Sequence, residues 1–177
     1  QKKFQIHVAI NKTKIKNKNL RIFSAKNKNL IDDYVKKNQI DAIINFAALT
    51  NLEFCEKNVN LSKKTNYFLP VYLAKVSKKF NLKYVFISTD NFKFKEKKLS
   101  ENSKIETLKV YSAHKRKSEK EILKINHKSL IIRTNFFCYG NKNRKSFSDV
   151  ILNSIKLKNK IGLFKDVYYT PIYWKYL

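Results

Sequence analysis

Four side chains between residues 88 and 115 are of types that can hold a carbonyl and transfer a proton to it: the hydroxyls of Ser88 and Thr89, the phenol of Tyr111 and the ammonium of Lys115. If residues 109–126 form a helix, Tyr111 and Lys115 stand at i and i+4 on one face. A nearby cation favours the phenolate, so Lys115 is expected to lower the pKa of Tyr111 from its usual value of about 10. The pattern predicts a proton donor beside a hydroxyl that holds a substrate carbonyl.

The place of these residues in the chain gives the pattern its weight, because Tyr-x3-Lys also arises by chance in a chain with 10 Tyr and 39 Lys and Arg. Residues 84–87 form an apolar run that predicts a buried strand, and Ser88, Thr89 and Asp90 follow it directly. The carboxyl ends of strands are where open α/β sheets bind ligands. The polar segment 91–108 is longer than an ordinary connection, and loops of that length usually have a function or move.

The rest of the chain alternates between strand and helix patterns, which predicts an α/β fold with a parallel sheet. The run 40–46 is continuously apolar, as in a central strand buried on both faces. Pro70 falls inside a helical pattern over 59–80 and predicts one bent helix. The other predicted elements are strands at 4–10, 20–23, 129–133 and 161–164, a helix to about residue 37 that Asn27 or Asn29 caps, and a helix at 146–158.

Length and composition predict one globular domain, because 177 residues with 43% hydrophobic side chains can bury a sizeable core. No apolar run approaches 18 residues, so the sequence predicts no membrane span. Cys55 and Cys138 stand alone, which indicates free thiols in a reducing compartment, and a cytoplasmic protein is expected. The three histidines have no spacing for a metal or a catalytic triad, so no metal site is predicted.

The net charge of +26 raises the alternative of a nucleic-acid-binding protein, since a basic surface attracts phosphates. Arginine, which reads base edges well, occurs only at positions 21, 116, 133 and 144. The lysines accompany abundant Asn, Ile, Phe and Tyr, which share A/T-rich codons, so a base-composition bias accounts for the charge. The sequence therefore disfavours nucleic acid as a partner, although a positive field suits any anionic ligand.

Six segments between residues 41 and 173 carry a family resemblance in their order and spacing. They are Asp41–Thr50, Asn66, Phe86–Asp90, Tyr111-x3-Lys115, Ile131–Gly140 and the Pro-containing Tyr169–Tyr173. The chain resembles the extended branch of the short-chain dehydrogenase/reductase superfamily, and within it most of all the dTDP-4-dehydrorhamnose reductases. The resemblance implies a Rossmann-like doubly wound parallel sheet.

The resemblance also implies a division of the chain, with residues 1–140 as the dinucleotide-binding domain and 141–177 as the start of a substrate-binding lobe. The family's first βα unit, with its Gly-rich turn, and most of its C-terminal lobe have no counterpart here, so a fragment truncated at the N-terminus is expected. Ser24 stands where the family has an Asp that reaches the adenine, and the segment 91–108 lacks the family's Gly and Pro.

The activity that the resemblance implies is reduction of the C4 ketone of a deoxysugar nucleotide by NADPH or NADH. Tyr111 would protonate the developing alkoxide, and Lys115 would lower the pKa of the phenol and bind the cofactor ribose. Thr89 would hold the carbonyl, and Ser88 is the second candidate for that role. The implied cofactor-binding residues are Lys12, Asn45, Ala47, Ala48, Ser88, Tyr111 and Lys115, and the implied substrate-binding residues are Asp90, Arg133, Asn135 and Phe136.

Several alternatives stay open at this point. Lys12 follows the first strand and favours NADP by accommodating a 2′-phosphate, or it is an ordinary solvated turn lysine. Asn66 anchors a group near the catalytic Lys, or it is a surface or capping residue. As alternatives to the reductase, the whole chain is a non-catalytic NADP-binding regulatory subunit on the same fold, or it is another sugar-nucleotide epimerase or dehydratase. The expected partner is a sugar nucleotide, and a homodimer is one possible assembly.

Overall fold

Two separate parallel sheets form the centre of the computed structural model, which describes residues 4–10, 19–25, 28–94, 100–140, 146–162 and 171–177. The first pairs β1 (His7–Ile10) with β2 (Arg21–Ser24). The second has the order β3-β4-β7, from β3 (Ala42–Asn45), β4 (Lys83–Ile87) and β7 (Leu130–Ile132). Each of these strands overlaps a predicted strand, β2 and β4 extending one residue beyond it, and the predicted α/β class with parallel strands is confirmed.

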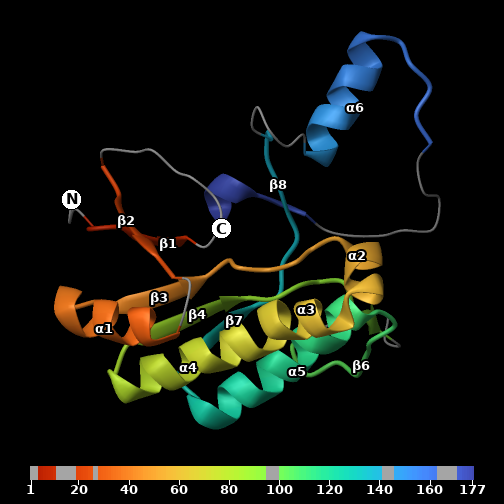
Figure 1. The fold of residues 1–177 in the computed structure, drawn as a ribbon. Helices are drawn as coiled ribbons and strands as arrows, with labels where there is room; N and C mark the ends of the chain where they lie inside the picture. The colour runs from red at the N-terminus through yellow and green to blue at the C-terminus, as the bar shows by residue number, and fades with distance from the viewer. Residues whose placement is uncertain (1–3, 11–18, 26–27, 95–99, 141–145, 163–170) are drawn as a thin grey trace.

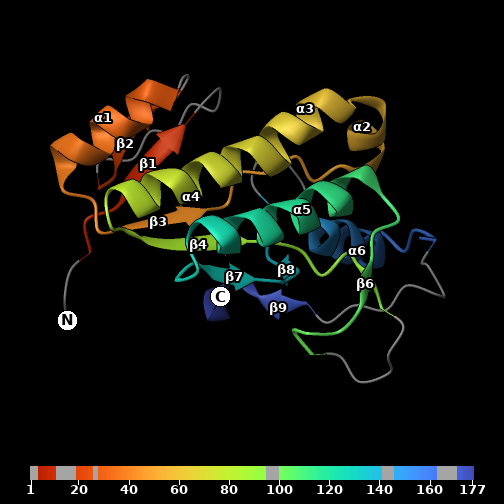
Figure 2. The same cartoon turned by 90° about the horizontal axis from the view of Figure 1, so that it is seen from below.

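Helices α4 (Leu69–Lys79) and α5 (Val110–Ile125) lie side by side on one face of the β3-β4-β7 sheet, and α1 (Lys28–Asn38) lies next to β1 and β2 (Figures 1 and 2). Side chains alternate between the faces of a strand, so Tyr84 and Phe86 of β4 point to the helices. They pack there in one core with apolar residues of the three helices, namely Ile31, Val35, Leu73, Ala74, Val76 and Ile122.

The segment predicted as one bent helix is a continuous run of α3 (Val59–Lys63), a π-helical turn η1 (Lys64–Phe68) and α4, preceded by the unpredicted α2 (Leu52–Lys57). Pro70 lies in the first turn of α4 and has no N–H to donate to the carbonyl of Asn66, four residues earlier. That carbonyl instead accepts from the hydroxyl of Ser118 on α5, at 2.6 Å. The proline thus leaves an acceptor through which α5 docks on the π-helical turn.

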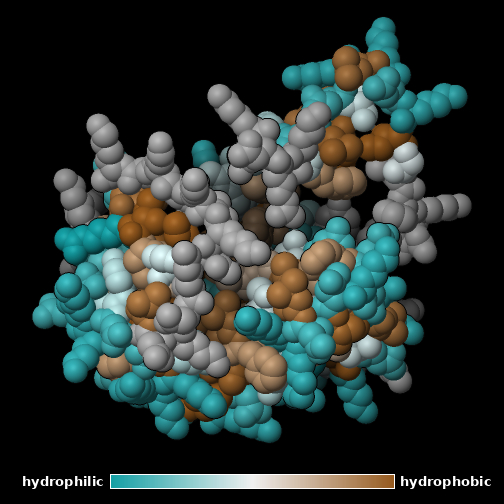
Figure 3. Space-filling view, in the orientation of Figure 1, coloured by the Kyte–Doolittle hydropathy of each residue, from teal (hydrophilic) through white to brown (hydrophobic). Residues whose placement is uncertain are grey.

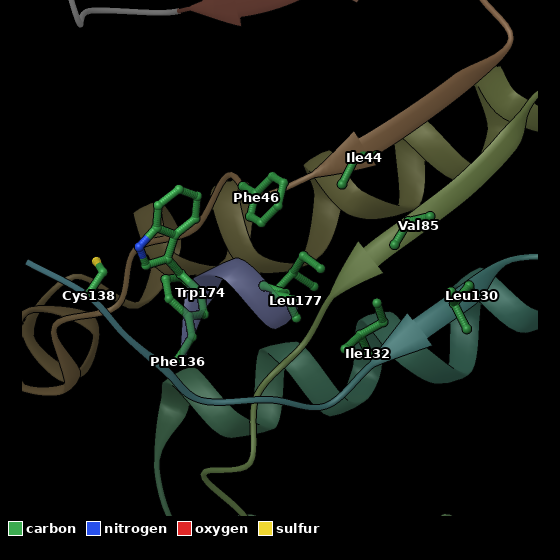
Figure 4. Close-up of a pocket in the computed structure, with 10 residues that line it drawn as sticks. Ile44, Phe46, Val85, Leu130, Ile132, Phe136, Cys138, Trp174 and Leu177 are labelled. Atoms are coloured by element: carbon green, nitrogen blue, oxygen red, sulfur yellow. The ribbon is translucent and has the colours of Figure 1, made fainter. Parts of the chain in front are cut away.

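The opposite face of the β3-β4-β7 sheet is apolar and open. It borders a cavity of about 600 Å³ that is lined by Ile44, Phe46, Val85, Ile87, Leu130, Ile132, Phe136, Cys138, Trp174 and Leu177 (Figure 4). Ile44 is 57% exposed and Leu130 is 55% exposed. In the doubly wound strand order 3-2-1-4-5-6, the two sheets match strands 3-2 and 4-5-6, so the break between them falls at position 1.

The remaining elements come from residues 91–108 and from the chain after β7. In the predicted loop 91–108, β5 (Lys93–Phe94) and β6 (Ile105–Glu106) form an antiparallel pair. The pair β8 (Phe136–Phe137) and β9 (Ile172–Tyr173) is followed by the turn η2 (Trp174–Tyr176). Helix α6 (Phe147–Lys156) begins at a capping box of Ser146 and Asp149 and exposes its apolar side chains (Figure 3).

One prediction of local structure was wrong in its described part, and another stays a prediction for one of its two candidate residues. Ile161 and Gly162 are not in a strand, and residues 163–164 of that predicted strand lie outside the described residues. Asn29 lies inside α1 and therefore does not cap it, while Asn27 lies outside the described residues. Within the described part of the chain, every helix is too short or too polar to cross a lipid bilayer.

Candidate active site

Thr89, Tyr111 and Lys115 meet at the carboxyl end of β4, as the sequence predicted. Thr89 follows β4, and Tyr111 and Lys115 lie one turn apart on the buried face of α5. The hydroxyl of Thr89 lies close enough to the phenol of Tyr111 to act on its pKa. The ammonium of Lys115 donates to the carbonyl of Ile87 at 2.6 Å. The arrangement puts a phenol, a hydroxyl and a cation around the last residues of one strand.

Lys115 is an unusually buried lysine, with only 2% of its surface exposed. Its ammonium lies 4.4 Å from the centroid of the Phe86 ring, which adds a cation–π contact to its bond with Ile87. Burial lowers the pKa of Lys115 from 10.5 to about 8, against the opposing effect of the Glu119 carboxylate. A proton on Lys115 is therefore held less tightly than on a surface lysine.

The prediction that the pKa of Tyr111 is lowered was wrong for this structure. Burial raises the pKa of Tyr111, the hydrogen bond with Thr89 opposes the rise, and the charges of Asp90 and Cys55 add to it. The helix does bring Lys115 to the same face, but its ammonium is directed to the Ile87 carbonyl. The phenol consequently keeps its proton at neutral pH, which suits a proton donor.

The structure separates the two candidate hydroxyls. Thr89 lies close enough to the Tyr111 phenol to act on its pKa, and it accepts from the backbone N–H of Asn91 at 3.1 Å. Ser88 turns the other way and donates to the carboxylate of Glu119 at 2.6 Å. Asp90, next in the chain, is half-buried, and burial raises the pKa of its carboxyl. Of the two hydroxyls, Thr89 is therefore the one in contact with the phenol.

Glu119 is the residue that sequence reasoning missed. It is 1% exposed and accepts hydrogen bonds from Ser88, Arg116 and Arg133. Burial alone would raise the pKa of Glu119, but the bonds from Arg133, Ser88 and Arg116 outweigh it and hold this pKa below its usual value. Its position four residues after Lys115, on the face of α5 that carries Tyr111, was the signal available in the sequence.

Arg133, predicted to bind substrate, directs its guanidinium to Glu119 and also donates to the carbonyl of Glu101 at 3.2 Å. The other two predicted substrate residues lie farther along the chain. Asn135 accepts from the backbone N–H of Ile172 at 2.9 Å, and Phe136 lines the apolar cavity on the open face of the sheet. The substrate roles of these residues stay predictions.

The turn after β3 has the form expected of a surface that a dinucleotide approaches closely. Asn45 accepts from the backbone N–H of Ala47 at 3.0 Å and donates to the hydroxyl of Tyr84 at 3.3 Å. Ala47 is exposed and Ala48 partly so, and their methyl groups leave the backbone accessible. These residues therefore fit a group that lies against main chain. Lys12 lies outside the described residues.

Asn66 holds the loop that follows this turn, and the alternative of a surface asparagine was wrong because Asn66 is buried. Its side chain accepts from the backbone N–H of Leu49 at 2.9 Å and donates to the carbonyl of Leu49 at 3.0 Å. His114 bonds with Ser62 at 2.9 Å. Among the described residues, no His, Cys, Asp and Glu side chains gather into a group that could hold a metal ion.

Comparison with known families decides the relationship. The sequence model of the RmlD substrate binding domain matches residues 7–177. The chain belongs to the RmlD substrate binding domain family. It is 29% identical over 151 residues to the dTDP-4-dehydrorhamnose reductase of Aggregatibacter actinomycetemcomitans, covering 83% of this chain and 50% of that protein. The chain spans about half the length of the curated relatives it matches.

Two solved structures show the same fold as this RmlD-family chain. The dTDP-4-dehydrorhamnose reductase of Bacillus anthracis, in complex with NADP, has a TM-score of 0.65 at 24% identity over 78% of this chain and 50% of that one. The UDP-glucose 4-epimerase of Thermotoga maritima, with UDP-glucose, has a TM-score of 0.77 at 14% identity over 92% of this chain and 59% of that one. The RmlD family member described here therefore has the fold of these nucleotide-sugar enzymes.

Proposed function

We propose that this chain is the catalytic part of an NAD(P)H-dependent reductase that acts on the C4 ketone of a deoxysugar nucleotide. The observation that carries the proposal is the meeting of Thr89, Tyr111 and Lys115 at the carboxyl end of β4. Membership of the RmlD family and the name of the curated relative supply the substrate class. Residues 141–177 are proposed as the start of the substrate lobe.

In this proposal the dinucleotide, when bound, supplies the hydride. The hydroxyl of Thr89 donates to the ketone oxygen, and the phenol of Tyr111 gives its proton to that oxygen as negative charge develops there. Because burial raises the pKa of Tyr111, the phenol enters the reaction protonated. Lys115 would contribute through the cofactor ribose and not through the phenol, because its ammonium is directed to the Ile87 carbonyl, and water returns the proton to the phenolate afterwards.

The proposed cofactor contacts lie on the same edge of the sheet. The exposed turn of Ala47 and Ala48, which Asn45 shapes, would hold the dinucleotide, and Lys115 would bind its ribose. Ser88 is a weaker candidate for a cofactor contact than the sequence suggested, because its hydroxyl is bonded to Glu119. Asp90, Arg133, Asn135 and Phe136 remain the proposed substrate residues.

A sugar-nucleotide epimerase is the second candidate, and the observation that favours it is the TM-score of 0.77 with the UDP-glucose epimerase. The likeness rests on 14% identity and so concerns the fold. The two activities differ in their products, because a reductase consumes one dinucleotide per turnover and an epimerase consumes none. Following dinucleotide absorbance at 340 nm while separating the sugar products distinguishes them. A non-catalytic subunit would change neither the dinucleotide absorbance nor the sugar.

The substitution Tyr111→Phe, made in the protein as its gene encodes it, tests the reductase proposal. It removes the transferred proton and keeps the ring, so kcat is expected to fall about 100-fold or more, while the dissociation constant of NADPH changes little. Lys115→Ala should lower kcat and also weaken the binding of NADPH. The control is Tyr139→Phe, an exposed tyrosine whose hydroxyl the mechanism does not use. If Tyr111→Phe keeps more than about a tenth of kcat, the assignment of the proton donor is wrong.

A further inference from the structure

Three side chains on one face of α5 hold the three consecutive residues 87–89 at the end of β4. Tyr111, Lys115 and Glu119 are spaced at i, i+4 and i+8, so they line one stripe of the helix. The phenol of Tyr111 lies close enough to the hydroxyl of Thr89 for that hydroxyl to act on its pKa, and Lys115 donates to the carbonyl of Ile87. Glu119 accepts from the hydroxyl of the middle one, Ser88, at 2.6 Å.

The carboxylate of Glu119 also connects this end of β4 to β7. Arg133, which follows β7, donates to it twice, at 3.0 and 2.8 Å, and Arg116 of α5 donates at 2.8 Å. The backbone N–H of Ser88 donates to the carbonyl of Ile132 in β7 at 2.7 Å. One buried carboxylate therefore receives four hydrogen bonds from α5 and from the ends of two neighbouring strands. Bonds that involve charged groups are stronger and more directional than neutral ones.

We propose that Glu119 is a positioning residue for the reaction: by fixing Ser88 against α5 and β7, it sets where the Thr89 hydroxyl lies relative to Tyr111. The inference rests on the proposed function. Thr89 is one residue from Ser88, so a displacement of Ser88 is transmitted directly to the hydroxyl that holds the carbonyl. A misplacement of about 1 Å at a reacting group can reduce a rate about 100-fold.

Stability alone does not account for a carboxylate with two arginines at this place. A buried ion pair is often no more stabilising than apolar residues of the same volume, because both charges lose their hydration. Apolar side chains could equally well attach α5 to the sheet, as Ile122 does elsewhere on the same helix. What apolar contacts do not provide is direction, and the four bonds to Glu119 fix the orientation of the strand ends as well as their distance.

The test compares Glu119→Gln, Ser88→Ala and the control Glu121→Gln in the protein as its gene encodes it. Glu121 lies on the same helix and is paired only at 3.8 Å with the exposed Lys124, so its variant removes the same charge away from the strands. In Glu119→Gln, kcat is expected to fall at least about 10-fold while KM for the sugar nucleotide and for NADPH changes less than about threefold. Ser88→Ala, which leaves both arginines paired, should lower kcat in the same way, and the control should match the wild type.

Wild-type kcat in Glu119→Gln overturns the inference. If Glu119→Gln does not fold, Ser88→Ala decides, and wild-type kcat in that variant overturns the inference instead. If the wild-type protein reduces no sugar nucleotide, the proposed function fails, and amide hydrogen exchange over residues 86–91 decides the positioning role separately. Faster exchange there in Ser88→Ala than in Glu121→Gln supports it, and equal exchange overturns it.

Discussion

The two faces of the β3-β4-β7 sheet are built from the same short strands and have opposite characters. On the face covered by α4 and α5, Phe86 is 0% exposed and Lys115 and Glu119 are buried beside it. On the other face, Ile44 and Leu130 are more than half exposed around the apolar cavity. The pKa values of Lys115 and Tyr111 therefore depend on the exclusion of water by the helices, because burial is the largest cause of both shifts.

The largest effect on stability is expected from Phe86→Ala on the covered face. The ring fills the core under α4 and α5 and makes a cation–π contact with the ammonium of Lys115. Its removal therefore leaves a cavity and deprives a buried charge of this contact. The free energy of unfolding should fall by about 3 to 5 kcal/mol. Urea denaturation followed by circular dichroism measures it. A loss below about 1 kcal/mol would mean that this face is not the closed core described above.

A smaller effect of the opposite sign is expected from Lys115→Met. The folded protein lowers the pKa of Lys115 from 10.5 to about 8, so at neutral pH the buried charge destabilises the fold. Between pH 8 and 10.5 Lys115 is protonated in the unfolded chain more than in the folded protein. The free energy of unfolding of the wild type therefore rises with pH over this range. The methionine variant should therefore be more stable by about 1 to 3 kcal/mol at pH 7, and this gain should shrink toward pH 10.5.

Thermal and urea unfolding at a series of pH values measure that gain. Lys124→Met is the matched control, because Lys124 is an exposed lysine of the same helix and its replacement should leave the stability at pH 7 nearly unchanged. A methionine variant that is less stable than the wild type at pH 7 would contradict the account, since it would show that the bond to the Ile87 carbonyl outweighs the loss of hydration.

The smallest effect is expected from Ile44→Ser on the open face. The side chain is already in contact with water, so its replacement should change the free energy of unfolding of residues 1–177 by less than about 1 kcal/mol. The same substitution is also made in the protein as its gene encodes it. A cost above about 2 kcal/mol there would show that another surface covers this face, whereas equal small costs would show that it stays open.

The sequence predicted those elements whose signal lies within their own residues. The strand β4 and the helix α5 are examples, since the apolar run 84–87 and the helical pattern over 109–126 are both confirmed. Helix α2 was missed because six residues give little periodicity. Its place depends on distant contacts, such as the bond that its Glu56 accepts from the backbone N–H of Val110 at 2.8 Å.

The site was predicted in part for the same reason. The spacing of Tyr111 and Lys115 fixed their common face, but the direction of the ammonium depends on which carbonyl the end of β4 offers. In the sequence alone, Glu119 is one of several charged residues of a polar helix. Its role becomes visible only in the fold, where the ends of two strands bring Ser88 and Arg133 to its carboxylate. Desolvation, which sets the pKa of Tyr111, is likewise a property of the packed molecule and not of a local pattern.

The amide of Asn66 has a consequence for how this sequence can change over generations. It pairs with both polar groups of the Leu49 peptide, the same pairing that an adjacent strand would offer. Because both of its bonds to position 49 are made to backbone groups, they are indifferent to the side chain at that position. The loop after β3 can therefore exchange its side chains by mutation, and with them what it touches, while a residue on a different element keeps the loop in register.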